Sequence, residues 1–278
     1  MFLDVLLAWV FEHGIKIAGI LLTAFFLRKF SHLIIEKTIR KAIKSNRFLS
    51  PESERKRENT LIGIFNQAFG IVVLILAGLM SLSELGIDIA PLIAGAGIIG
   101  LALGFGGQYL IKDLIAGLFV ILENQYRIGD VVCLGDTCGL VENISMRTTI
   151  LRDLDGTVHY VPNGEIKKAS NLSKEYSRVN LNIGISYKTN LEHVISVVNE
   201  VGNKLAKDPK WKNFIIKPPQ FLRINDFADS AIIIKILGDT QPLKQWDVTG
   251  ELRKRLKIAF DKKGIEIPFP QRVIHYDK

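Results

Sequence analysis

Two uncharged stretches, separated by one short loop, constrain this chain more than any other feature. Residues 59–83 and residues 89–111 contain no aspartate, glutamate, lysine or arginine. Each stretch is long enough to cross the roughly 30 Å of hydrocarbon in a bilayer, which takes about 20 helical residues. We therefore expect an integral membrane protein with spans at 61–82 and 90–108.

A third apolar stretch near the N-terminus is shorter, because charged residues flank it. Residues 17–27 are apolar, and Arg28 and Lys29 follow them directly. Long basic side chains can reach the membrane interface from inside a helix, so both fit a first span at 14–35. The apolar run lacks the small-residue cleavage site of a signal peptide, and we expect this span to be retained. The chain is thus predicted to begin with an α-helical membrane domain of three transmembrane helices, residues 1–125.

Basic residues are distributed unequally between the loops. Segment 37–57 is rich in lysine and arginine, whereas the charges of the next loop are Glu84 and Asp88. By the positive-inside rule the first loop is cytoplasmic, the N-terminus is outside, and everything after the third span is cytoplasmic. The net charge of +8 follows from such loops. No recognition-helix, zinc-finger or aromatic-basic motif predicts a nucleic-acid partner.

The cysteines and histidines predict no cofactor and no enzyme. Cys133 and Cys138 are too few for a disulfide framework, and their spacing differs from the two-residue spacing of common metal sites, so we assign them neither a metal nor a redox function. His159, His193 and His275 have no spacing that indicates a ligand set or a catalytic triad. The alternative function is a membrane-anchored enzyme or signalling protein that uses its cytoplasmic part. A secondary transporter is disfavoured, because there is no inverted repeat and no acidic residue inside the second and third spans.

Beyond Gln125 the sequence changes to short runs of β-branched residues broken by turn signals. Residues 148–151 are typical of a strand, and Asp155-Gly156 and Pro162-Asn163-Gly164 are turn signals. Turns at such close spacing predict a small β-barrel domain at 126–172.

The last part of the chain, residues 173–278, alternates between strand and helix patterns. Strand patterns occur at 179–186, 221–225 and 231–237, and helix patterns occur at 191–206 and 243–263. This βαββα order predicts an α+β, ferredoxin-like domain with the split βαβ arrangement. A final strand is expected at 272–276.

The third span sorts into four stripes when each residue is rotated by about 100° around a helix. One stripe contains Ala94, Gly97, Ile98, Leu101, Phe105 and Gln108, and the opposite stripe contains Leu92, Ile99, Leu103 and Leu110. The flanks between them consist of the smallest side chains, namely Ala96, Gly100 and Gly107 on one side and Gly95, Ala102 and Gly106 on the other. Gly104 is counted with these packing residues.

Small side chains matter because apolar surface alone does not drive helices together in lipid, whereas close backbone approach does. A helix with two small flanks can contact an identical neighbour on each side and close a ring. We expect the Leu101 stripe to face the pore, because it carries Gln108 and thin positions at Ala94 and Gly97. Rings of Leu101 and Phe105 would then form a hydrophobic constriction that gates by dewetting.

Two other interpretations of these glycines stand beside the pore. The glycines could pack helices within a single chain. Residues 95–100 also match the dinucleotide-binding pattern G-x-G-x-x-G, although they lie in an uncharged stretch with no βαβ unit around it.

The third span ends at Lys112 and Asp113, whose charges mark the cytoplasmic interface. Gly106-Gly107, just before them, is a suitable place for a bend. The continuation, residues 109–125, is predicted to be an amphipathic helix that lies along the membrane or caps the β-barrel. The alternative is a straight helix that simply leaves the bilayer.

At these segments the chain resembles the small-conductance mechanosensitive channel family of bacteria. The most specific pieces are 100–105, 113–117 (Asp-Leu-Ile-Ala-Gly), Gly129-Asp130 and 161–164 (Val-Pro-Asn-Gly). The resemblance implies a homoheptamer in the bacterial cytoplasmic (inner) membrane, opened by membrane tension and releasing ions and small osmolytes during hypo-osmotic shock. It also implies that the soluble domains form a vestibule, with the final strand joining a small barrel at the sevenfold axis.

The resemblance assigns roles to single residues as well. The family's two pore-closing leucine positions fall on Leu101 and Phe105. The family often has a hinge glycine where this chain has Tyr109, so Gly106-Gly107 or Gly117 is expected to bend instead.

Basic residues near the cytoplasmic interface are candidate contacts for lipid headgroups. These are Arg28, Lys29, Arg55 and Arg57. The alternative for all four is a solvated, positive-inside loop.

Overall fold

The computed structural model describes residues 9–42 and 50–274, apart from the side chains of Val10 and Ala42. The chain divides into two compact units, residues 1–106 and 107–278, and each is described by itself. Some sequence predictions lie outside the described residues: part of the basic loop, His275, and the end of the final strand.

Among the described residues, three helices are long and apolar enough to cross a membrane, which confirms the predicted three long apolar helices. A π-helical turn, Val10–Gly14, leads into α2, Ile15–Ala42. Helix α3, Pro51–Glu84, begins at an N-cap where the Ser50 hydroxyl accepts a hydrogen bond from the Ser53 N–H at 3.3 Å. Helix α4 comprises Ala90–Leu122.

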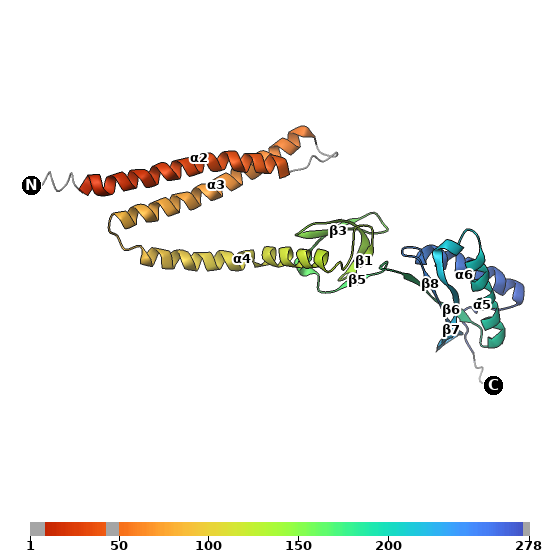
Figure 1. Cartoon of the computed structure of the whole chain (residues 1–278). Coiled ribbons are helices and arrows are strands. Elements are labelled where there is room, and N and C mark those ends of the chain that lie inside the picture. Colours follow the sequence, from red (N-terminus) through yellow and green to blue (C-terminus); the bar gives the residue numbers. More distant parts are fainter. Residues whose placement is uncertain (1–8, 43–49, 275–278) are drawn as a thin grey trace, which may run out of the picture. The chain divides into compact units, whose positions relative to one another are not determined.

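Helices α2 and α3 form an antiparallel hairpin (Figure 1), which polar contacts hold at three levels. At one end Arg40 Nη1 donates to Glu58 at 2.8 Å. Further along, His32 Nδ1 and Asn66 Nδ2 are 2.7 Å apart. At the other end Glu84 accepts a hydrogen bond from Lys16 at 2.7 Å. The apolar lengths between these levels leave most large side chains exposed, as expected for surfaces that face lipid.

The β-domain is a five-stranded antiparallel sheet in the order β4-β3-β2-β1-β5. The strands are β1 Val131–Leu134, β2 Thr137–Ile144, β3 Thr148–Arg152, β4 Val158–Pro162 and β5 Ala169–Asn171. This is the β-domain predicted as a small β-barrel, and among the described residues its end strands β4 and β5 do not pair with each other. Its core includes a residue of the preceding helix. Val120 of α4 and Tyr126 join Val132, Val141 and Leu151 of the sheet, so a helix covers the apolar face.

The C-terminal domain confirms the predicted βαββα order. Its elements are β6 Ser177–Ile185, α5 Leu191–Lys207, β7 Ile215–Ala228, β8 Ala231–Thr240 and α6 Gln245–Lys263. Strand β8 lies between β6 and β7 and is antiparallel to both, which is the split βαβ arrangement. Buried aliphatic residues of the strands pack against α5 and α6, which lie beside the sheet in Figure 1. Residues 272–274 of the expected final strand have no strand structure in the single chain.

The β1–β2 hairpin shows a feature that the sequence analysis did not assign. Cys133 and Cys138 occupy directly opposite positions on the two strands and form a disulfide, with a Cα–Cα distance of 4.0 Å. The residues between them make a tight turn in which Gly135 has a φ of +61°. A five-residue separation is unusual for a metal site, but it suits a cross-strand pair.

Candidate functional site

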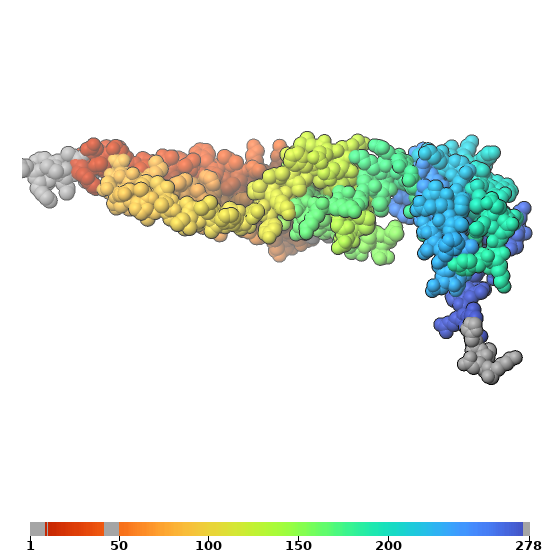
Figure 2. All heavy atoms as spheres, turned by 90° about the horizontal axis from the view of Figure 1, so that it is seen from below, coloured from red at the N-terminus to blue at the C-terminus, as the bar shows by residue number. Residues whose placement is uncertain are grey.

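Among the described residues, the small side chains in the first half of α4 have no packing partner. A Cβ built on any of its glycines would have no neighbour within 4 Å; these are Gly95, Gly97, Gly100, Gly104, Gly106 and Gly107. The most apolar stretch of α4 contains no buried residue, as is also true of the first helix, whereas part of that of α3 is buried. The atoms of this half of α4, yellow in Figure 2, are uncovered on the face shown there. Packing among the described residues of one chain therefore does not account for these glycines.

The predicted gate residues lie on this uncovered helix. Leu101 is 65% exposed and Phe105 is 73% exposed. Because the segment is helical throughout, residues four apart lie one turn apart on the same side. The remaining predicted pore-lining residues, Ala94, Gly97 and Gln108, belong to the same helix, and their facing toward a pore stays a prediction.

The second half of α4 packs against the β-domain. Asp113, Gly117 and Val120 are its buried residues, and their spacing of four and three places them on one helix face. Of the arrangements considered for this continuation, the structure shows a helix that packs on the β-domain and is continuous with the first half of α4.

Asp113 makes the polar contact of this interface. Its side chain is 8% exposed, and Oδ1 accepts a hydrogen bond from the backbone N–H of Gly164 at 2.8 Å. Oδ2 lies 3.5 Å from Nε of Arg147, whose side chain is mostly exposed. A carboxylate is the stronger kind of acceptor for a buried N–H. Asp113 therefore joins α4 to the turn after β4.

Gly117 allows the backbones to come close. A Cβ at this position would lie 2.1 Å from the carbonyl oxygen of Met146 and 2.4 Å from Nδ2 of Asn163. Asn163, which is 1% exposed, donates from Nδ2 to the carbonyl oxygens of Ser145 and Met146. Gly117 thus has a packing role, besides the bending role proposed for it from sequence.

The turn at Asn163 and Gly164 is the part of this site that sequence reasoning missed. The resemblance marks 161–164 as a family motif, but it does not predict that this turn contacts α4. Thr149 Oγ1 donates to Asn163 Oδ1 at 2.9 Å and lies 3.0 Å from the hydroxyl of Tyr126. Burial raises the pKa of Tyr126 above its ordinary value, against the opposing effect of that Thr149 contact. The Pro-Asn-Gly signal indicates a turn, but nothing in the sequence pairs that turn with α4.

Helix α4 is uninterrupted from Ala90 to Leu122. No break in the helix occurs at Gly106-Gly107, at Tyr109 or at Lys112, and Tyr109 is 76% exposed. The predicted separate helix at 109–125 is therefore the second half of α4 in the single chain, and a bend stays a prediction.

The four basic residues predicted to contact lipid are all exposed. Arg28 lies against α3, because a Cβ on Gly70 would be 3.3 Å from its Nε. Lys29, Arg55 and Arg57 form no ion pair with any described residue. Their contact with headgroups stays a prediction.

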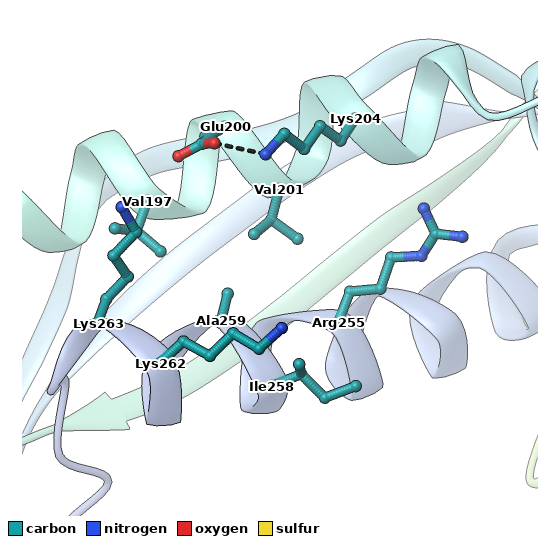
Figure 3. Close-up of a pocket in the computed structure, with 9 residues that line it drawn as sticks. All are labelled: Val197, Glu200, Val201, Lys204, Arg255, Ile258, Ala259, Lys262 and Lys263. Atoms are coloured by element: carbon teal, nitrogen blue, oxygen red, sulfur yellow. Dashed lines mark hydrogen bonds and ion pairs between the residues drawn. The ribbon is translucent and has the colours of Figure 1, made fainter.

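The C-terminal domain has a groove of about 290 Å³ between α5 and α6 (Figure 3). It is lined by Val197, Glu200, Val201, Lys204, Arg255, Ile258, Ala259, Lys262 and Lys263. Lys204 donates to Glu200 at 2.6 Å, and Arg255 is bound to Asp208 and Glu251 outside the lining. One carboxylate and four cations beside aliphatic side chains do not constitute a nucleophile and base.

The histidines of the soluble part have structural partners. His159 Nε2 is 2.9 Å from Asp153 Oδ2, and this contact holds the pKa of Asp153 below its ordinary value. His193 Nε2 lies 3.4 Å from the carbonyl oxygen of Lys263. Within the described residues, no three histidine, cysteine, aspartate or glutamate side chains are grouped to hold a metal ion.

Three family models match successive parts of the chain. The model described as transmembrane helices 2/3 of the mechanosensitive ion channel matches residues 68–108. The mechanosensitive ion channel β-domain matches residues 109–174, and the C-terminal part of the mechanosensitive ion channel MscS matches residues 179–267.

Relatives of known sequence cover nearly the whole chain. The small-conductance mechanosensitive channel of Caldanaerobacter subterraneus subsp. tengcongensis is 33% identical over 260 residues, which are 94% of this chain and 90% of that protein. The large-conductance mechanosensitive channel MscMJLR of Methanocaldococcus jannaschii is 27% identical over 273 residues, which are 95% of this chain and 73% of that protein.

A solved structure shares the fold. The crystal structure of Helicobacter pylori MscS in its closed state superposes with a TM-score of 0.73 and 22% identity, covering 97% of this chain and 98% of that chain. Since the identity is low, the match concerns the fold: three long apolar helices, a β-domain and an α+β C-terminal domain.

Proposed function

Because the chain belongs to the MscS family of mechanosensitive ion channels, which are channels and not enzymes, we propose that membrane tension opens a pore lined by α4 of several copies. The observation that supports this most directly is the unpartnered small-residue surface of α4, from Gly95 to Gly107. In lipid such a surface is stabilised by close approach of another helix. Identical copies supply that helix on both flanks, and we propose seven of them.

The gate in this proposal is formed by Leu101 and Phe105. Both side chains are more than half exposed in the single chain, and each would repeat around the pore axis as a ring of apolar groups. A narrow apolar ring excludes water and therefore ions, without any blocking charge. Ions and small osmolytes pass when the rings widen.

Polar side chains of the α2–α3 hairpin indicate where the bilayer lies. Glu84, with Lys16 and His13, forms one polar level, and His32 with Asn66 forms another. Positions 66 and 84 are 18 residues apart, and at 1.5 Å per residue this is about 27 Å, close to the thickness of the hydrocarbon layer. Arg28, packed against Gly70, then lies near the inner level, within reach of headgroup phosphates.

The orientation follows from the charge of the loops. The segment between α2 and α3 is strongly basic, and the short link between α3 and α4 is acidic. By the positive-inside rule, the β-domain and the C-terminal domain then lie in the cytoplasm. We propose that the membrane is the inner membrane of a bacterium.

Tension favours whichever state occupies the larger area in the membrane plane. Helices α2 and α3 present apolar surface to lipid, and α4 follows α3 after the short link 85–89. The smooth flanks of α4 allow neighbouring copies to slide past each other, while Asp113 and Gly117 keep its second half attached to the β-domain.

The test is patch recording of the purified chain in lipid under increasing suction. Wild type should open before the patch ruptures. Phe105→Ser should open at lower tension or leak, because a hydroxyl hydrates the constriction. Phe105→Leu, which keeps the ring apolar, and Leu103→Ser, on the opposite stripe, should gate close to wild type. A Phe105→Ser channel with the wild-type threshold would remove Phe105 from the gate, and no conductance before rupture would refute the channel itself.

A further inference from the structure

The β1–β2 hairpin places two cysteines together by means that do not depend on the bond between them. Register pairs Val132 with Gly139, Cys133 with Cys138, and Leu134 with Thr137. The two-residue turn that joins the strands sets this register, and a glycine with positive φ at its first position suits such a turn. The thiols therefore stay opposite each other when the disulfide is reduced.

Contacts on the other side of β1 hold Cys133 in place as well. Strand β1 also pairs with β5, where Cys133 is opposite Ser170. The N–H of Gly135 in the turn donates to the carbonyl oxygen of Lys168 at 3.1 Å. Closing or opening the disulfide thus requires no change of strand pairing.

The pair is accessible from solvent. Val132 and Leu134 are 0% and 4% exposed and point into the core, so Cys133 between them points to the other face of the sheet. Cys133 is partly exposed and Cys138 is exposed. A small soluble disulfide or thiol can therefore reach Cys138 directly.

In the proposed orientation this accessible cysteine pair lies in the cytoplasm. In the cytoplasm, thiols are kept reduced, and disulfides that form there are usually transient. We propose that Cys133 and Cys138 are a reversible thiol–disulfide site, a dithiol at rest that low-molecular-weight disulfides such as oxidised glutathione convert to the cross-strand bond. The cytoplasmic setting rests on the proposed function, whereas the pairing of the thiols does not.

The chemistry is a two-step exchange. The thiolate of Cys138 attacks one sulfur of the small disulfide, forms a mixed disulfide and releases one small thiolate. The thiolate of Cys133 then attacks the Cys138 sulfur and releases the second. The protein pair loses two electrons and two protons, and the small disulfide is reduced to two thiols. Excess small thiol reverses both steps.

The first experiment uses the full chain in lipid nanodiscs, equilibrated with glutathione buffers from fully reduced to fully oxidised. After an acid quench, free thiols are labelled with a maleimide-polyethylene glycol and the intact mass is measured. We expect a transition from doubly labelled to unlabelled chain that has lost two hydrogens, with little singly labelled chain between. Cys133→Ser and Cys138→Ser should instead gain the mass of one glutathione. Two free thiols, or a stable glutathione adduct on wild type, at the oxidising end would overturn the proposal.

The second experiment separates the redox site from the orientation. Oxidised glutathione, which does not cross bilayers, is added to inside-out and to right-side-out membrane vesicles that contain the reduced chain. Oxidation in the inside-out vesicles supports both proposals. Oxidation confined to right-side-out vesicles would overturn the cytoplasmic setting and with it the resting dithiol, while a channel current in the same membranes would keep the proposed function.

Discussion

In the first half of α4, residues 90–107, a Cβ on any glycine would have no described neighbour within 4 Å, whereas in the second half a Cβ on Gly117 would lie 2.1 Å from the carbonyl oxygen of Met146. One helix thus carries glycines that have no partner inside the chain and a glycine that is pressed against one. We propose that the glycines of the first group pack against α4 of neighbouring copies. Substitutions test this distinction, because those in the second half should lower the stability of the soluble part more than those in the first half.

Gly117→Ala should have the largest effect. The new methyl group would collide with the backbone at Met146, which cannot move aside as a flexible side chain can. Overpacking of this kind costs about 3 kcal/mol. Hydrogen exchange of the full chain in nanodiscs should show faster exchange of the β2 and β3 amides. Gly104→Ala, where the methyl group meets nothing, is the matched control and should leave this exchange unchanged. Equal exchange in both variants would contradict the packing role of Gly117.

Asp113→Ala should have the next largest effect. It leaves the N–H of Gly164 buried without its acceptor, which costs about 1–3 kcal/mol. Asp113→Asn keeps an acceptor oxygen and should cost less. Arg147→Ala should cost little, because the side chain of Arg147 is 66% exposed. The same exchange measurement ranks the three variants, and a cost for Arg147→Ala equal to that of Asp113→Ala would shift the contact from the hydrogen bond to the ion pair.

The contrast between the two halves of α4 also shows which features of the structure can be predicted from the sequence. The three spans and the small-residue stripes were predictable, because charge-free length and helical periodicity are local properties. The βαββα order was predictable for the same reason. The contact between Asp113 and Gly164 joins residues 51 apart in the chain. No periodicity within α4 indicates which distant turn it will meet, so Gly117 could be proposed as a bend and its close approach to Met146 could not.

The cysteines show a second limit of prediction from the sequence. Their spacing was compared with metal sites and disulfide frameworks, and neither fits. The strand pairing that brings Cys133 opposite Cys138 depends on a turn of two residues, and the spacing of the cysteines does not by itself indicate this turn. The β-barrel was likewise predicted from strand spacing, whereas the closure of its core depends on Val120, which comes from the helix.

The first half of α4 and the soluble domains should also differ in their response to pH. Residues 89–108 contain no titratable side chain, whereas the soluble domains contain many. Burial pulls the pKa of Asp239 upward, but the hydrogen bonds and charges of Arg178 and Lys217 outweigh burial and hold the pKa below its ordinary value. A lowered pKa stabilises the fold above the unfolded value of about 3.9, and this stability is lost as the pH falls through the folded pKa.

Arg178→Gln should therefore move acid unfolding of the C-terminal domain to higher pH, because burial then acts on Asp239 with less opposition. At neutral pH the loss of stability should be small, since the side chain of Arg178 is 45% exposed and water screens its charge. The fluorescence of Trp211, which packs against the domain core, reports the transition. Lys204→Gln breaks an exposed pair and should leave the midpoint in place. A midpoint unmoved by Arg178→Gln would mean that Asp239 does not control acid stability.

Gly100→Leu should have the smallest effect on the soluble part and the clearest effect on assembly. Nothing in the chain lies within 4 Å of a Cβ at this position, and leucine favours a helix more than glycine does, so β-domain exchange should match wild type within about 0.5 kcal/mol. The bulk would instead hold neighbouring α4 helices apart, because close approach in lipid needs small residues. Native mass spectrometry should show seven copies for wild type and smaller species for the variant. An intact Gly100→Leu heptamer would place this flank against lipid, and disturbed β-domain exchange would mean that Gly100 packs within the chain after all.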